Sequence, residues 1–80
     1  MTLEELNALI DKSINSNAVR PGAMETTNAL NAEYALGAIF AYIDIIWKTY
    51  GIDAMIETKD RVQGAIDELT ERTQILYKGA

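Results

Sequence analysis

The feature that most limits what this chain can fold into is a stretch of 14 residues, Tyr34 to Trp47, in which only Gly37 and Asp44 interrupt apolar residues. A helix that is apolar on nearly every side has to be buried on nearly every side. The chain has only 80 residues, and domains of this size bury only about 60% of their unfolded surface. The sequence therefore predicts that other copies of the chain cover part of this segment.

The chain contains no His and no Cys. Their absence excludes disulfide frameworks, thiolate or imidazole zinc sites, and Ser-His-Asp or Cys-His catalysis. The remaining residues form no recognisable pair of nucleophile and base. We therefore expect a protein that is not an enzyme and that carries no cofactor.

The charge balance is acidic, with 7 Lys and Arg against 12 Asp and Glu, a formal net charge of −5. Binding to a nucleic-acid duplex is not expected, because such proteins usually carry a basic stripe. The apolar stretch is shorter than the roughly 20 residues of a membrane span, and the first residues lack the basic and apolar regions of a secretory signal. The expectation is one cytoplasmic domain over residues 1–80 with no membrane partner.

Apolar periodicity predicts an all-α fold with helices over residues 3–15, 23–50 and 53–78. Thr2 and Glu5 match the pattern of a capping box at the start of the first helix. Arg20, Pro21 and Gly22 interrupt the pattern after it. The predicted fold is a short N-terminal helix followed by a long antiparallel helical hairpin, assembled into a homo-oligomeric helical bundle.

The hairpin is predicted from the short link between its two long helices. Gly51 is placed to end one helix, Asp53 is a suitable N-cap for the next, and only Ile52 lies between them. The third helix carries a heptad-like seam of Met55, Val62, Leu69 and Leu76. On its other side Glu57–Arg61 and Glu68–Arg72 have the spacing of i,i+4 ion pairs.

The best polar cluster follows the turn at Arg20. A helix start offers free backbone N–H groups and a partial positive charge, which together favour an anion. Arg20, Thr26, Thr27 and Asn28 are therefore candidate ligands for a small anion such as a nucleotide. The alternative is an ordinary turn with local caps, and Glu25 would repel an anion there.

Aromatic residues gather in the second predicted helix, which holds Tyr34, Phe40, Tyr42, Trp47 and Tyr50. Packing in a core or a subunit interface is the favoured interpretation, since aromatic side chains dominate both. Tyr34 and Tyr42 are the better candidates for a ligand pocket, because a buried tyrosine hydroxyl needs a polar partner.

Asp44 is the one charged residue inside the apolar stretch. Lys48 is four residues further along the helix and can form an ion pair with Asp44. In a helical interface, such a polar pair would set the register of packing. The alternative is that Asp44 is a catalytic carboxylate. The predicted oligomer interface comprises Leu30, Gly37, Ile39, Phe40, Ala41, Ile43, Asp44 and Trp47. Asp67, Glu68 and Glu71 are more simply a solvated face than a metal site.

Two kinds of function fit these observations. The first is a non-catalytic homo-oligomeric binding or assembly protein that interacts through its apolar central helix. The second is capture of a small anionic ligand, such as a cyclic nucleotide, between subunits. In layout alone, a short helix before an oligomerising hairpin resembles small phage proteins that sequester immune signalling nucleotides. A virion or scaffold component is a further alternative.

Overall fold

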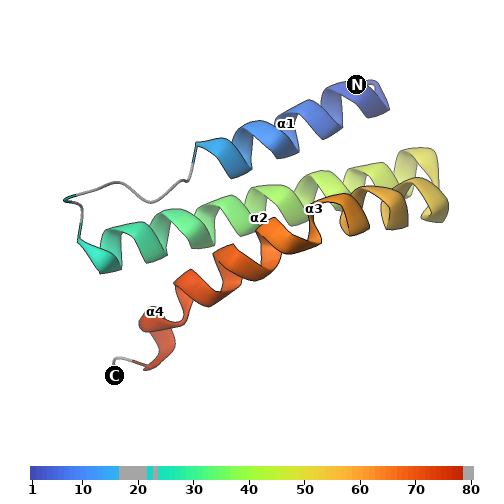
Figure 1. The fold of residues 1–80 in the computed structure, drawn as a ribbon. Helices are drawn as coiled ribbons and strands as arrows, with labels where there is room; N and C mark the ends of the chain where they lie inside the picture. The colour runs from blue at the N-terminus through green and yellow to red at the C-terminus, as the bar shows by residue number, and fades with distance from the viewer. Residues whose placement is uncertain (17–21, 23, 79–80) are drawn as a thin grey trace.

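Four α-helices and no strand make up the described part of the chain, which comprises residues 1–16, 22 and 24–78 of a computed structural model. The helices are α1 (Leu3–Asn15), α2 (Glu25–Tyr50), α3 (Ile52–Thr73) and the short α4 (Ile75–Lys78). Figure 1 shows α2 and α3 running side by side in opposite directions, with α1 lying along α2. The predicted all-α class is confirmed.

The start of α1 is fixed by the predicted capping box. The backbone N–H of Glu5 donates to the Thr2 hydroxyl at 3.1 Å, and the backbone N–H of Thr2 donates to the Glu5 carboxylate at 3.0 Å. Leu6 and Ile10 share one side of the helix and are completely buried. The Tyr50 hydroxyl also donates to the Met1 carbonyl at 2.6 Å, so the end of α2 holds the start of the chain.

A single residue, Gly51, reverses the chain between α2 and α3. Its φ of 95° lies in the left-handed region that glycine adopts at little cost. Gly51 is both the C-cap of α2 and the N-cap of α3, so α3 begins at Ile52. The prediction that Asp53 caps α3 is therefore wrong, because the glycine reverses the chain before that residue is reached.

The core lies between the facing sides of the hairpin and the inner side of α1. It consists of Leu6 and Ile10 from α1, Ala32, Ala35, Ile39, Ile43 and Ile46 from α2, and Val62, Ile66 and Leu69 from α3. The predicted seam residues Val62 and Leu69 are buried, and Met55 packs half-buried against the cluster. Buried aliphatic side chains contribute about 1.5–3 kcal/mol each to folding, so this cluster holds the three helices together.

The third helix is shorter than predicted, because α3 ends at Thr73 rather than continuing to residue 78. The Thr70 hydroxyl donates to the Ile66 carbonyl and the Thr73 hydroxyl donates to the Thr70 carbonyl, each at 2.7 Å. Threonines that bond back to their own helix in this way tend to bend it. At Gln74 the backbone N–H bonds to the Glu71 carbonyl, a tighter turn than an α-helix makes.

By length and composition alone, α2 as a whole is long and apolar enough to cross a membrane. The most apolar stretch covers only Tyr34 to Trp47, whereas α2 has 26 residues. The core helix of a soluble protein passes the same test, and 33% of the most apolar window of α2 is buried against the rest of the chain.

Candidate functional site

The side of α2 that turns away from the core carries large apolar side chains. At 100° per residue, nine of the α2 residues between positions 30 and 48 fall within an arc of about 140° on this side. We call them the open face: Leu30, Glu33, Tyr34, Gly37, Phe40, Ala41, Asp44, Trp47 and Lys48. Leu30, Phe40 and Trp47 are 46%, 47% and 52% exposed. Six of the eight predicted interface residues belong to this face.

Exposed apolar side chains also lie at the start of α3. Ile52 and Ile56 lie one turn apart at the start of α3 and are both exposed. On the helix they are about 140–180° from Arg61, which reaches α1 by an ion pair with Asp11. They therefore lie on the side of the hairpin that α1 does not cover.

Two residues of the predicted interface belong to the core instead. Ile39 is completely buried and Ile43 is 7% exposed, and both pack in the cluster formed with α3. Their assignment to the oligomer interface is wrong, because the hairpin partner within the same chain already covers this stripe of α2. The helix is thus buried on one side by its own chain and open on the other.

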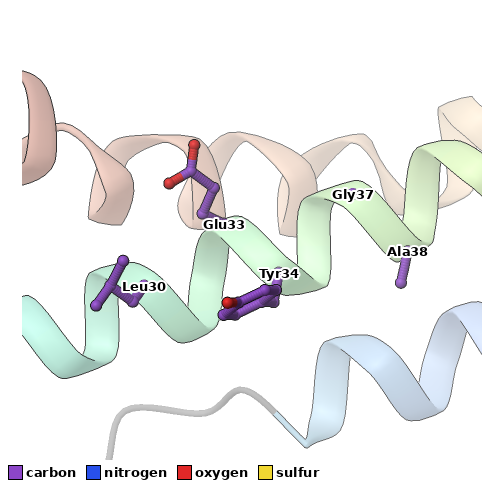
Figure 2. A pocket seen from close by; sticks show the side chains of 5 residues that line it. All are labelled: Leu30, Glu33, Tyr34, Gly37 and Ala38. Carbon is purple, nitrogen blue, oxygen red and sulfur yellow. The ribbon is translucent and has the colours of Figure 1, made fainter.

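A hollow of 480 Å³ lies at the N-terminal end of the open face. Its lining consists of Leu30, Glu33, Tyr34, Gly37 and Ala38. Figure 2 shows Glu33 pointing toward the side of α3 and α4 and Tyr34 pointing toward the side of α1. A Cβ added at Gly37 meets no atom within 4 Å. The small residue therefore leaves room for another chain to approach closely.

Charged groups on the open face are paired and exposed. The Lys48 ammonium lies 2.8 Å from the Asp44 carboxylate, with side-chain exposures of 72% and 47%. The predicted i,i+4 pair is therefore present. The alternative of a catalytic Asp44 depended on burial without a partner, and neither condition is met. At the other end, Glu33 accepts a hydrogen bond from the Tyr77 hydroxyl of α4.

A second depression, of 340 Å³, lies between α1 and α2. It brings the two predicted pocket tyrosines together, and its lining is Leu9, Lys12, Ser13, Ser16, Tyr34, Ala35, Ala38 and Tyr42. The hydroxyls of Ser13 and Ser16 donate to carbonyls of α1 at 3.0 and 2.6 Å. The C-terminal end of a helix carries partial negative charge. Lys12 is thus the one positively charged residue in the lining.

The described residues predicted to bind an anion are not among those that line this depression. Arg20 lies outside the described residues. Thr26 and Thr27 are exposed in the first turn of α2, and Asn28 is buried there. The N-cap Met24 offers no side-chain hydrogen bond to that turn. The two described depressions that Tyr34 lines include none of the three.

A polar network between α1 and α3 was not foreseen from the sequence. Arg61 donates to Asp11 at 2.7 Å and to the Asn7 side chain at 2.9 Å, and the Thr58 hydroxyl donates to the same Asn7 oxygen at 3.3 Å. Arg61 therefore binds α1 rather than making the predicted pair with Glu57. The predicted Glu68–Arg72 pair is present at 3.4 Å. No local pattern reveals the first network, because it depends on which side of α3 the distant α1 reaches.

Within the described ranges, no three acidic side chains gather into a group able to hold a metal ion. Every buried side-chain nitrogen and oxygen there has a hydrogen-bond partner. No family model matches the chain, and no curated protein or solved structure is significantly similar to it. The open face of α2 is consequently the strongest candidate site.

Proposed function

We propose that this protein is a non-catalytic assembly protein that associates with further copies of itself through the open face of α2. The observation that carries the proposal is the exposure of Leu30, Phe40 and Trp47 on one side of a helix whose other side is the core. Contiguous exposed apolar surface of this kind is typical of protein interfaces. Large aromatic side chains contribute most of the binding energy at such sites.

A second copy is the partner that the size of the chain favours. A domain of 80 residues with no disulfide is short of buried apolar surface. Association of two hairpins through their uncovered sides creates a larger shared core of the kind found in helical bundles. The assembled protein is soluble and cytoplasmic in this proposal, since the open face then packs on protein rather than on lipid.

Capture of a small anionic ligand is the second candidate function. It is supported by the depression that holds Tyr34 and Tyr42 beside Lys12, where an aromatic ring can stack on a planar ligand. The serines in its lining already donate to their own helix. Self-association is therefore the better supported of the two functions.

The proposal is tested by measuring mass in solution. Native mass spectrometry and sedimentation velocity at micromolar concentration are expected to show a dimer or a larger assembly. The same mass spectrum reports any ligand retained from the host. A folded wild-type monomer contradicts self-association, and flotation of the protein with phospholipid vesicles assigns the open face to a membrane instead.

Two glycines provide a matched pair of variants. Gly37 and Gly64 both lie in helix interiors, are exposed and have open space where a Cβ would stand. Replacing either with Gln improves helix propensity by roughly 0.5–1 kcal/mol, so both monomers remain folded. Gly37→Gln fills the hollow and is expected to shift the protein toward monomer, whereas Gly64→Gln is expected to leave the assembly intact. Equal behaviour of the two variants counts against the open face.

A further inference from the structure

The charges on the open face are separated along the helix. Glu33 lies near one end of it and Lys48 at the other, and Lys48 is the only basic residue of α2. They are 15 positions apart, which corresponds to about 22 Å along the helix axis. Any second copy that packs along this face therefore meets the Glu33 carboxylate at one end and, at the other, the Asp44–Lys48 ion pair, which carries the one ammonium group of the face.

The direction of the second copy decides how these charges meet. Parallel packing places Glu33 against Glu33, which is repulsive, and sets the two Asp44–Lys48 ion pairs side by side, where attraction and repulsion offset each other. Antiparallel packing about a two-fold axis between Phe40 and Ala41 places each Glu33 level with a Lys48 of the other copy. A two-fold axis makes every contact occur twice, so the antiparallel arrangement gains two opposite-charge contacts.

We propose that two copies of this chain bind antiparallel through the open face, with Glu33 of each facing Lys48 of the other. This inference rests on the proposed function and adds the direction and register of pairing. The same axis brings the Asp44–Lys48 ion pair of one copy over Gly37 of the other. The hollow there has Glu33 in its lining, so the arriving ammonium lies between two carboxylates.

The contacts already made by these side chains are compatible with the pairing. Lys48 gives one of its three N–H donors to Asp44 and keeps the others for Glu33 of the second copy. Glu33 receives the Tyr77 hydroxyl on one carboxylate oxygen and has the other available. The absence of a side chain at Gly37 allows the two α2 axes to approach to about 8 Å, the close end of helix packing distances.

Charge reversal tests the direction. Glu33→Lys and Lys48→Glu each turn both antiparallel contacts into repulsions, and each is expected to weaken dimerisation about tenfold at low salt. The double variant Glu33→Lys, Lys48→Glu restores opposite charges, and its dimer affinity is expected to return to within about threefold of the wild type. Sedimentation equilibrium measures all four affinities. Parallel packing predicts no change in Glu33→Lys, because one like-charge contact replaces another, and no rescue of Lys48→Glu in the double variant.

Two further variants separate pairing from intramolecular effects. Tyr77→Phe removes the hydrogen bond to Glu33, and Asp44→Asn removes the carboxylate of the Asp44–Lys48 ion pair. Both are expected to retain dimerisation, with circular dichroism reporting the fold. If Tyr77→Phe weakens the dimer as much as Glu33→Lys, or if the double variant is not rescued, the antiparallel register is wrong while self-association stands. A monomeric wild type overturns the proposed function itself.

Discussion

The carboxylate of Glu5 closes a hydrogen-bonded ring with Thr2 at the start of α1. The backbone N–H of Thr2 donates to this carboxylate and holds the pKa of Glu5 below its ordinary value, and the side chain of Thr2 lowers it further. A lowered pKa in the folded state means that the unfolded chain binds the proton more readily. The contact therefore stabilises the fold above the unfolded pKa and loses its effect as the pH falls through the folded pKa.

Replacement of Thr2 tests this cap. Thr2→Ala is expected to destabilise the folded chain by about 1 kcal/mol at neutral pH, because an N-terminal backbone donor of α1 loses its acceptor. In the variant, the pKa of Glu5 is expected to rise only part of the way toward its ordinary value, because the backbone N–H that donates to the carboxylate is kept and only the contribution of the Thr2 side chain is lost. Urea unfolding measures the first effect and NMR titration of the Glu5 carboxyl carbon measures the second. An unchanged Glu5 titration contradicts the contribution of the Thr2 side chain.

At the scale of the element, α2 differs sharply between its two sides. Ile46 is completely buried, whereas its neighbour Ile45 is 43% exposed. Ile46→Ala is expected to cost about 2–5 kcal/mol of unfolding free energy through lost burial and a cavity. Ile45→Ala, the same change one residue earlier, is expected to cost less than half as much. Urea unfolding of both variants below the dimerisation concentration checks the difference, and similar losses contradict the observed helix orientation.

Local patterns predicted those parts of the elements that depend on neighbours in the sequence. The capping box of Thr2 and Glu5, the reversal at Gly51 and the Asp44–Lys48 pair are all of this kind. The assignment of Ile39 and Ile43 failed because nothing in an almost continuously apolar helix marks the side that its own hairpin partner covers. That side is fixed by long-range packing.

The end of α3 shows a similar limit. Thr73 is not part of the predicted heptad seam, yet it is buried, and its hydroxyl donates to the Thr70 carbonyl one turn earlier. Because this hydroxyl has a hydrogen-bond partner within the helix, burying Thr73 leaves no unpaired polar group. The helix ends at this residue. The open face was partly predictable, since Leu30, Phe40 and Trp47 follow the helical period, whereas the contact of Arg61 with α1 was not.

At the scale of the whole molecule, a tyrosine hydroxyl joins segments that are far apart in the chain. Tyr77 of α4 donates to Glu33 of α2, 44 residues away. This hydrogen bond and the negative charge of Glu33 raise the pKa of Tyr77 above its ordinary value. With a raised folded pKa, the contact stabilises the fold fully below the unfolded pKa and is lost as the pH rises through the folded pKa.

Alkaline titration tests this contact. Ultraviolet absorbance of tyrosinate in the wild type is expected to show one of the four tyrosines titrating at a higher pH than it does in Glu33→Gln. Tyr77→Phe is expected to remove that late component. If the titration curves of the wild type and Glu33→Gln superimpose, the contact between Tyr77 and Glu33 is not formed in solution.

The one-residue link at Gly51 has a consequence for how the molecule folds. Contacts beside the turn join residues only a few positions apart, whereas the contact between Glu33 and Tyr77 at the far end closes 44 positions. Loop closure grows less favourable with length, by about 0.6 kcal/mol for each doubling. When pairing starts at Gly51, each new contact shortens the loop that the next one has to close. Contacts between α2 and α3 are therefore expected to form first beside Gly51 and then progressively further from it, and α4 is expected to pack last.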